Sequence, residues 1–408
     1  MTAVTENLAS WRLRARTRVR NDRTRTTLAR PPAFVVVCAT VAVLNVVGLV
    51  MILSASSVAA LSNYGSSWYF FNRQLAWAVL GAIAFLVAAR VDYRLWKHAV
   101  PWLLIGSVVL LVAVLLPGVG IMVDGSRRWL GIASLRIQPS EVAKLALLVF
   151  GAQVLARPPA RLVDWRAWQS VPIVAGVFGL LVVAEPDLDS SIVLGIIALS
   201  LLLVAGAQVS HLAALGGAAL VLAGILAIAE PYRRARVLTF LDPWSDTSNT
   251  GYQISQSLIA LGSGGIDGVG LGAGRAKWMF LPNAHTDFIF AIVGEELGLI
   301  GCLLVLGLFA GFGLVGLHVA RAAPDRFGML LATGVTAWVV GQAAINLGAV
   351  VGVLPVSGIT LPFLSAGGSS LVFTMAAAGT LANVARRSEV PRRAATHRTA
   401  ARAGRAAG

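Results

Sequence analysis

Charged residues and cysteine are both scarce in this chain. Only 12% of its 408 residues are charged, whereas 57% are hydrophobic, and the mean hydropathy is +0.79. A soluble globular protein carries roughly 25% charged residues, so this composition excludes an ordinary soluble globule. The two cysteines, Cys38 and Cys302, both lie inside apolar runs. We therefore interpret them as small hydrophobic residues, not as a disulfide or a pair of metal ligands.

Long apolar runs take the place of the missing charge. A transmembrane helix needs about 20 apolar residues to cross about 30 Å of hydrocarbon, and about ten runs approach this length. They cover residues 34–58, 74–90, 99–117, 141–156, 171–185, 190–206, 211–229, 287–317, 327–354 and 366–385. Glu185-Pro186-Asp187 has to split the stretch Val171–Gly206 into two crossings. The predicted fold class is an all-α polytopic membrane protein with about ten transmembrane helices.

Basic residues indicate how the chain is oriented. The 33 Lys and Arg residues outnumber the 18 Asp and Glu residues, for a net charge of +15. They cluster in both termini and in the loops at 90–98, 157–168 and 321–326, which the positive-inside rule places in the cytoplasm. An even number of crossings leaves both termini on that side. We expect these arginines to anchor the topology and to contact anionic membrane lipids, with no nucleic acid as a partner.

This topology divides the chain into three parts. Residues 1–30 and 388–408 are polar and rich in Arg, Ala and Thr, so we expect disordered cytoplasmic tails. Residues 31–387 form the predicted transmembrane domain, with a large extracytoplasmic loop at 230–286 between the seventh and eighth helices. We expect no cleavable signal peptide, because the basic stretch is long and the apolar run Phe34–Ser57 exceeds a signal core.

A second group of basic residues lies on or near the extracytoplasmic side. Its members are Arg73, Arg127, Arg128, Arg136, Lys144, Arg233, Arg234, Arg236, Arg275 and Lys277. Cations there oppose the insertion bias, and a bound diphosphate or other polyanionic headgroup would compensate them, since Arg and Lys are the usual phosphate partners. Long loops are translocated regardless of charge, which explains Arg233–Lys277 without a ligand. It does not explain the short segment that ends with Arg136 and Lys144.

Two glycine-containing segments lie at or near the membrane. Gly268–Gly274 alternates glycine with other residues, but no strand precedes it, so a dinucleotide-binding fold is not expected. We interpret it as flexible backbone that admits a large headgroup, placed after a short amphipathic helix at 251–261. Leu354–Ser370 contains both proline and glycine, which is tolerated at membrane depth only inside protein or a watery cavity. We predict that this segment is a re-entrant element lining a site.

The most informative short stretch is Leu281–Phe290, which places Asp287 between a polar loop and a helix apolar enough to enter a bilayer. An ionisable group at a membrane boundary is costly to hold, so Asp287 is a candidate for function. The alternative is that Thr286 or Asp287 only caps the following helix. The direction of the Asp287 pKa shift stays open, because the helix N-terminus favours the charged form and burial favours the neutral form.

Several motifs follow one another in order across most of residues 34–386. They are Gly125–Trp129, Arg136–Glu141 with Lys144, Glu185–Leu188, Gly251–Gln253, Leu261–Gly265, Leu281–Gly298 and Asn346–Ser370. In order and spacing they resemble the SEDS family of polytopic cell-wall glycosyltransferases, represented by FtsW, RodA and SpoVE. Leu241–Trp244 and Gly358–Pro362 resemble the division protein FtsW more than RodA. The departures from the pattern, Asp189, Asp267, Asn283 and Ala366, do not remove Asp287.

The resemblance implies that the protein polymerises lipid II, an undecaprenyl-diphosphate-linked precursor, at the outer face of the bacterial cytoplasmic membrane. It implies a class B penicillin-binding transpeptidase and other divisome proteins as partners, and a location at the division septum. The acceptor 4-hydroxyl attacks with inversion and a diphosphate leaves, so charge neutralisation replaces the general acid of glycoside hydrolysis. One carboxylate is still needed to accept the hydroxyl proton, and Asp287 is our candidate general base.

The remaining site candidates are expected to bind the substrate. Arg136 and Lys144 are the first candidates for the diphosphate and Arg73 is the second, whereas Arg128 belongs to an arginine pair that a loop usually leaves solvated. Glu141 shares a helix face with Lys144 and is expected to position it. Three further candidates are Asp187, His285 and Ser365. Asp187 is expected either to orient a cation or to coordinate a metal, His285 to hydrogen-bond Asp287 or a sugar, and Ser365 to contact the substrate.

No cofactor is required by this chemistry, but a divalent cation, Mg²⁺ or Mn²⁺, stays open. Asp187-x-Asp189 has the spacing of a metal motif without a second acid, and His285 with Asp287 makes an incomplete metal site. Three tryptophans either stack on sugars or anchor the protein at the membrane interface: Trp129, Trp244 and Trp278. Glu295 and Glu296 cannot both face lipid cheaply, so we expect them to pair with a cation or to line a cavity.

Two rival functions fit parts of the sequence. A lipid II flippase would use broken helices and charges near the midplane, and a cell-division scaffold would use the tails for partners. The position of the charges separates the rivals, because a transferase gathers Asp287, Arg136 and Lys144 at one extracytoplasmic cavity. A flippase instead needs polar groups throughout the depth of the bilayer. The charges crowd one boundary, which favours the transferase.

Overall fold

Helices make up most of the structure. The computed structural model describes residues 32–123, 126–132, 135–157, 166, 168–229, 234, 239–240, 242, 244 and 251–388. The helices within these residues are α2 (Pro32–Tyr64), α3 (Tyr69–Arg90), α4 (Trp96–Leu115), α5 (Pro139–Leu155), α6 (Ser170–Ala184), α7 (Leu188–Ala205), α8 (Val209–Ala229), α10 (Tyr252–Ser263), α11 (Ile289–Ala322), α12 (Arg326–Val350) and α13 (Ser369–Ser388). The predicted tails, Gly125 and most of the predicted loop between 230 and 250 lie outside the described residues.

Every predicted apolar run contains one of these helices, which confirms the predicted fold class. Within the described part of the chain, seven helices are long and apolar enough to cross a membrane: α2, α3, α4 with the 3-10 turn Tyr93–Leu95, α7, α8, α11 and α12. The helix α6 is apolar but has only 15 residues, and α5 has 17. The total of about ten crossings therefore stays a prediction. The predicted amphipathic helix at 251–261 is confirmed as α10.

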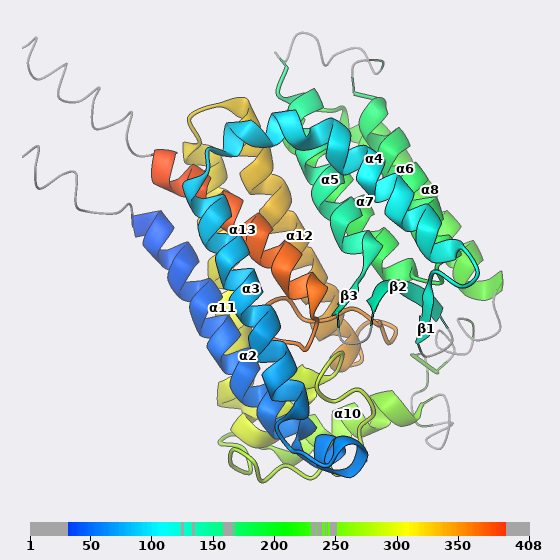
Figure 1. Ribbon diagram of the computed structural model, residues 1–408, viewed down its shortest axis with the longest axis vertical. Helices are drawn as coiled ribbons and strands as arrows, with labels where there is room; N and C mark the ends of the chain where they lie inside the picture. The colour runs from blue at the N-terminus through cyan, green and yellow to red at the C-terminus, as the bar shows by residue number, and fades with distance from the viewer. Residues whose placement is uncertain are drawn as a thin grey trace, which may run out of the picture.

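The bundle has two halves that meet along α12 and α13 (Figure 1). The helices α2, α3 and α11 lie on one side, and α4 to α8 lie on the other. The halves are joined because α13 packs along α3 while α12 packs against both α7 and α11. The helix α8 lies at the outer edge of the second half (Figure 1). None of the residues in its apolar stretch Val209–Leu226 is buried by protein, as expected for a helix that faces lipid.

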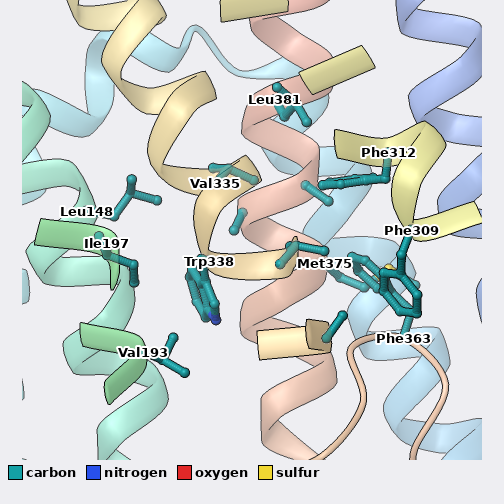
Figure 2. Packing of buried hydrophobic residues seen from close by; sticks show 14 of the residues in the cluster. Leu148, Val193, Ile197, Phe309, Phe312, Val335, Trp338, Phe363, Met375 and Leu381 are labelled. Carbon is teal, nitrogen blue, oxygen red and sulfur yellow. The ribbon is translucent and has the colours of Figure 1, made fainter. Parts of the chain in front are cut away.

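Large apolar side chains fill the centre between these helices (Figure 2). Trp338 of α12 is fully buried and lies beside Val193 of α7. On the far side of α13, Phe312 of α11 meets Phe363, whose ring centroid is 6.1 Å away. Phe363 belongs to the irregular segment before α13, so the core extends from the helices into that segment.

Some predicted boundaries are wrong at the ends of the runs. The helix α2 continues to Tyr64, beyond the predicted end at residue 58, and α12 ends at Val350, before the predicted end at 354. The last predicted run began at 366, but α13 begins only at Ser369 and continues to Ser388. Hydropathy alone does not locate these ends, because the irregular segment before α13 is itself apolar.

A small antiparallel sheet, which the sequence did not predict, lies between α4 and α5. Its strands are β1 (Ile121–Val123), β2 (Ser126–Ile132) and β3 (Leu135–Ile137), in the order β1-β2-β3. Trp129 pairs with Ile121, and Arg136 pairs with Gly131. Figure 1 shows the sheet at the same end of the bundle as α10. The predicted Arg128 and Arg136 are therefore held on strands, not in a free loop.

The helix α11 is broken at Gly298, where φ is 65° and ψ is −162°. The loop after α10 fills the break. The amides of Val269 and Gly270 donate to the carbonyls of Glu295 and Glu296 at 3.0 and 3.1 Å, and the amide of Leu299 donates to the Gly265 carbonyl at 2.9 Å. Broken helices are tolerated at membrane depth when protein satisfies the freed backbone groups in this way.

Glycine is required on both sides of this junction. A Cβ atom on Gly298 would lie 2.4 Å from the Gly268 nitrogen, and one on Gly268 would lie 2.7 Å from the Gly298 nitrogen. Both residues have positive φ, of 65° and 80°. The glycines of Gly268–Gly274 thus allow the loop to approach α11, where we had predicted flexible backbone for a headgroup.

Most of the segment from Ile359 to Ser370 is buried in protein, as predicted for a re-entrant element, whereas Leu354 and Gly358 are exposed. Ile359, Leu361 and Leu364 are buried, and the carbonyl of Ile359 accepts a hydrogen bond of 2.8 Å from Asn346 of α12. One helical turn away, Gln342 donates to the carbonyl of Thr360 at 2.9 Å. These two amide side chains explain how an irregular backbone persists beside apolar helices.

Candidate functional site

One cavity brings together predicted residues that are far apart in the sequence. Its volume is about 190 Å³. Its lining comes from α3, the sheet, the turn before α11 and the segment before α13: Phe70, Arg73, Gln74, Trp77, Val123, Trp129, Arg136, His285, Thr286, Ala366, Gly367 and Gly368. Arg73 and Arg136, which were predicted to bind phosphate, and the predicted His285 therefore line the same cavity. Aromatic rings and two guanidinium groups suit a ligand with both apolar or sugar surfaces and an anionic group.

Arg73 lies near the start of α3 and is half-buried at this cavity. Within the part of the chain that the structure describes, no carboxylate forms an ion pair with Arg73. A half-buried guanidinium without an acidic partner favours an anionic ligand, because the ligand would supply the missing counter-charge. Arg136, which β3 brings to the same cavity, adds a second guanidinium.

His285 closes one side of the cavity. Its ring lies 4.5 Å from the ring of Phe70, and its backbone carbonyl accepts a 3.0 Å hydrogen bond from the amide of Ala366. Burial lowers the pKa of His285 to about 4, so the imidazole is neutral at physiological pH. A neutral imidazole donates one hydrogen bond and accepts one, which suits a hydroxyl better than a diphosphate.

We expect this buried neutral histidine to make stability depend on pH. Its pKa is about 4 in the folded protein, against 6.5 for an unperturbed histidine, so unfolded chains bind the proton first as the pH falls. Stability should be complete above pH about 6.5 and fall between about 6.5 and 4, by up to about 3 kcal/mol. Thermal unfolding of the wild type and of His285→Gln across this range measures the difference. Parallel pH curves for the two proteins would contradict the prediction.

Asp287 lies in a turn that three neighbouring groups stabilise. The amides of Thr286 and Phe288 donate to the carbonyl of Asn283 at 3.1 and 3.3 Å, and the Thr286 hydroxyl donates to it at 3.2 Å. The N-cap position of α11 is held by Phe288, not by Thr286 or Asp287. The alternative that Thr286 or Asp287 is the N-cap residue of α11 is therefore wrong.

Asn346 connects the Asp287 turn to the re-entrant segment. Its side-chain amide donates to the carbonyl of Asp287 and to the carbonyl of Ile359, each at 2.8 Å. Asp287 is itself only half-buried and directly follows Thr286, which lines the cavity. The backbone of the predicted base is thus held in place, but Asp287 itself is not among the residues that line the cavity, whereas His285 and Thr286 just before it are. We did not predict a role for Asn346 or Gln342, although polar residues inside an apolar helix signal one.

Lys144 is enclosed by protein and does not line the cavity. Its ammonium lies 2.8 Å from Glu141 Oε1, 3.1 Å from Gln342 Oε1 and 5.2 Å from the centroid of the Trp338 ring. The predicted pairing of Glu141 with Lys144 is confirmed. In this structure, however, the Lys144 side chain is 0% exposed, so direct contact with a diphosphate requires α5 or α12 to move. The role of Lys144 in substrate binding stays a prediction.

Arg128 is not simply solvated. It donates to the carbonyl of Pro186, and its guanidinium lies 3.9 Å from Asp187 Oδ1. Asp187 is buried, accepts a 3.0 Å hydrogen bond from Gln138 and caps α7 by accepting from Ser190. The expectation that Asp187 orients a cation therefore fits this geometry. Neither residue lines the cavity.

Two further predicted positions have structural contacts. The hydroxyl of Ser365 accepts from the amide of Leu361 at 2.9 Å, and its carbonyl accepts from Gln74 at 3.3 Å. Ser365 is 3% exposed, so it shapes the re-entrant segment behind the cavity. Asp189, which departs from the SEDS pattern, accepts a 2.8 Å hydrogen bond from the amide of Gly358 and so contacts the same segment.

Glu295 and Glu296 bind the loop that precedes Asp287, which confirms the prediction that they do not face lipid. Glu295 accepts from the backbone amides of Arg275 and Ala276. Glu296 lies 3.2 Å from the ammonium of Lys277 and accepts from the hydroxyl of Ser54 on α2 at 2.6 Å. Lys277 also donates to Ser54, at 3.3 Å. These contacts join α2, the loop and the first half of α11.

We expect the Lys277–Glu296 pair to hold the loop in place. Both side chains are at most 6% exposed, so Lys277→Met leaves a buried carboxylate without its cation. The expected loss of stability is about 3–5 kcal/mol, and Glu296→Gln in the same chain should restore part of it. The matched control is Arg94→Met, because the Arg94 side chain is 53% exposed and such pairs contribute about 0–1 kcal/mol. Thermal unfolding in detergent tests this, and equal shifts for Lys277→Met and Arg94→Met would contradict it.

The described side chains contain no group of three or more His, Cys, Asp or Glu that could hold a metal ion. The Asp187 carboxylate contacts Gln138 and Arg128, and Asp189 contacts Gly358. A divalent cation at this motif would have to displace these contacts or bind with the help of a substrate diphosphate.

The family of the chain follows from comparison with known proteins. The family model of FtsW, RodA and SpoVE, described as "Cell cycle protein", matches residues 35–390. The chain belongs to this family. The FtsW/RodA/SpoVE match covers the transmembrane domain, the cavity and the Asp287 turn.

Individual members of the FtsW/RodA/SpoVE family are similar over most of the chain. "Probable peptidoglycan glycosyltransferase FtsW" of Mycobacterium tuberculosis is 43% identical over 361 residues, which is 88% of this chain and 69% of that protein. "Stage V sporulation protein E" of Bacillus subtilis is 41% identical, over 88% of this chain and 99% of that protein.

Solved structures of the family share the fold. A chain from "Structural coordination of polymerization and crosslinking by a peptidoglycan synthase complex" has a TM-score of 0.70 and 29% identity, covering 88% of this chain and 99% of that chain. The rod shape determining protein RodA of Thermus thermophilus has a TM-score of 0.64 and 28% identity, covering 88% of this chain and 97% of that chain.

Proposed function

We propose that this protein is a peptidoglycan glycosyltransferase of the FtsW type, which polymerises lipid II into glycan strands at the outer face of the cytoplasmic membrane. The observation that supports this most is the cavity in which Arg73 and Arg136 meet the turn that contains Asp287. Relatives named peptidoglycan glycosyltransferase FtsW, at 43% and 41% identity, support the same activity. The multi-pass membrane architecture fits a substrate with a polyprenyl tail.

In the proposed reaction, the 4-hydroxyl of the acceptor sugar attacks the anomeric carbon of the donor. A carbon–oxygen bond forms at that carbon with inversion, and the bond to the diphosphate breaks with its electron pair leaving on the diphosphate oxygen. Arg73 and Arg136 neutralise the charge that develops there, so the leaving group needs no proton. The carboxylate of Asp287 accepts the proton of the attacking hydroxyl.

The neutral His285 and the aromatic lining position the sugars in this scheme. An imidazole that is neutral at physiological pH donates to or accepts from a sugar hydroxyl without competing for the diphosphate. Trp77 and Trp129 line the cavity, and tryptophan rings of this kind can stack on sugars. Glu141 pairs with Lys144 inside the protein, so Lys144 would contribute its charge to the diphosphate only if α5 or α12 moved.

We further propose a class B penicillin-binding protein as the partner, at the division septum. The structural relative from a peptidoglycan synthase complex that couples polymerisation to crosslinking supports such a partner. The basic ends of the chain support cytoplasmic termini, which leave the cavity on the opposite, outer side.

A lipid II flippase is the rival from another class. It would need charged or polar groups along a path through the bilayer. Arg73, Arg136 and His285 instead line one cavity, and the sheet that carries Arg136 lies at the same end of the bundle as α10 (Figure 1). The deciding experiment incubates the purified protein and its cognate transpeptidase with lipid II in liposomes and resolves the glycan products by gel electrophoresis. Translocated but unpolymerised lipid II would favour the flippase and overturn the proposal.

A further inference from the structure

A row of exposed apolar side chains follows the loop between α10 and α11. We call it the apolar rim, and its members are Ile266, Val269, Leu271, Trp278, Met279 and Phe280. Their exposed fractions lie between 45% for Val269 and 68% for Ile266. Several large apolar side chains exposed in one loop mark contact with lipid or with another protein, although the same loop also exposes the charged residues Asp267 and Arg275.

The break in α11 sets the depth of one end of the apolar rim. The first half of α11, Ile289–Glu296, is buried throughout, whereas Leu299 and Ile300 are 52% and 59% exposed. The part from Leu299 to Ala322 is long enough, at about 1.5 Å per residue, to cross about 30 Å of hydrocarbon by itself. The lipid-facing surface of α11 therefore begins just after the break, at Leu299.

Backbone pairing places the loop at this same depth. The amide of Leu299 donates to the carbonyl of Gly265 at 2.9 Å, and the amide of Ile300 donates to the carbonyl of Ile266 at 3.3 Å. Ile266 is thus paired directly with a residue whose side chain faces lipid. Because its own side chain is 68% exposed, the lipid that covers Ile300 is positioned to cover Ile266.

The other end of the apolar rim is tied to a different spanning helix. Lys277 donates to the hydroxyl of Ser54 on α2 and pairs with Glu296, so its charge is turned inward. Trp278 follows Lys277 directly and is 60% exposed. One turn before Ser54, Val50 is 46% exposed on the apolar surface of α2. Trp278 therefore lies beside a helix that lipid also surrounds.

The residue types of the apolar rim fit the boundary region of a bilayer. Tryptophan prefers the level of the lipid headgroups, and Trp278 is followed by two further large apolar residues. In the first part of the rim, the amide of Gly268 donates to the carbonyl of Gly264, and the amides of Val269 and Gly270 donate to the carbonyls of Glu295 and Glu296 in α11. These three amides are therefore already paired where the loop would meet hydrocarbon.

We propose that the apolar rim inserts into the bilayer leaflet at the loop end of the bundle, with lipid acyl chains as its partner. This contact holds the Asp287 turn at a constant depth relative to the lipid headgroups, where the diphosphate of a lipid-linked substrate lies. The membrane contact does not depend on the proposed transferase activity. It adds a lipid-facing surface to a loop that the sequence alone places outside the membrane.

Cysteine labelling in liposomes tests the insertion. In a Cys38→Ala, Cys302→Ala background, Leu271→Cys and Trp278→Cys each receive a bimane label, and the protein is reconstituted in phosphatidylcholine and phosphatidylglycerol. Leu314→Cys, on the exposed face of α11 at 70%, is the lipid reference. Ser263→Cys, at the exposed end of α10, is the water reference. Quenching is measured with a doxyl-labelled phospholipid and, separately, with iodide.

Labels at Leu271 and Trp278 are expected to lose fluorescence to the doxyl lipid nearly as strongly as the label at Leu314, and to resist iodide. Quenching by iodide alone, as at Ser263, would overturn the proposal. Shielding from both quenchers would also overturn it, because a protein surface such as a second copy would then cover the apolar rim. Liposomes without a partner protein keep these outcomes separate from the test of polymerisation.

Discussion

Asp287→Asn is expected to abolish glycan polymerisation while leaving lipid II binding close to that of the wild type. The amide keeps the size and shape of the side chain, but it replaces one acceptor oxygen with an NH2 donor and cannot accept the proton of the attacking hydroxyl. Loss of a general base lowers kcat by about 100- to 10,000-fold. The turn should persist, because the carbonyl of Asn283 and the amide of Asn346 hold it through backbone groups.

Two variants separate this effect from a general loss of charge in the loop. Asp267→Asn removes an exposed carboxylate from the same loop and should leave turnover unchanged. Asp287→Glu keeps the acid but moves it by one methylene, so partial activity is expected. Polymerisation of lipid II by purified protein with its transpeptidase measures all three. Normal product from Asp287→Asn would remove Asp287 as the base, whereas inactive wild type would remove the proposed function itself.

The double variant Arg73→Ala, Arg136→Ala is expected to lose affinity for lipid II. Both guanidinium groups line the cavity, and a hydrogen bond to a charged group contributes about 1.5–3 kcal/mol. Each single variant should therefore bind about 10- to 100-fold more weakly, since 1.4 kcal/mol corresponds to about tenfold. Binding of fluorescent lipid II to purified protein in detergent measures the dissociation constant.

The control for the arginines lies on the same sheet. Arg127 is on β2 beside Arg128 and does not line the cavity, so Arg127→Ala should leave the dissociation constant unchanged. Arg136→Lys keeps the charge but loses the bidentate geometry of guanidinium, which predicts an intermediate affinity. Equal losses for Arg127→Ala and Arg136→Ala would show that the effect is long-range attraction and not a diphosphate site.

Hydropathy and charge were sufficient to predict the helices, because their signal is local to each run. The position of Asp287 at the start of α11 and the pairing of Glu141 with Lys144 were also predictable, since both depend on residues close in the sequence. The resemblance to the SEDS family pointed to Arg136 and His285, whereas the position of Arg73 at the outer end of a predicted helix made it a candidate. Together these residues formed one hypothesis before any geometry was known.

Long-range contacts explain what the sequence could not show. The break in α11 depends on the fit between Gly298 and Gly268, and the enclosure of Lys144 depends on Gln342 of another helix. The small sheet was missed because its strands are short and rich in charge, so no alternating apolar pattern marked them. Arg128 appeared solvated until Asp187 was found beside it.

The break at Gly298 divides α11 into a part that spans the membrane and a part that holds the Asp287 turn. A membrane that becomes thinner or thicker makes a spanning helix tilt, and an unbroken rod would transmit that tilt to the residues at its tip. Here the helix is interrupted at Gly298, and Glu295 and Glu296 hold the first half to the loop and to α2. We therefore expect the position of Asp287 to depend less on bilayer thickness than it would at the tip of an unbroken helix.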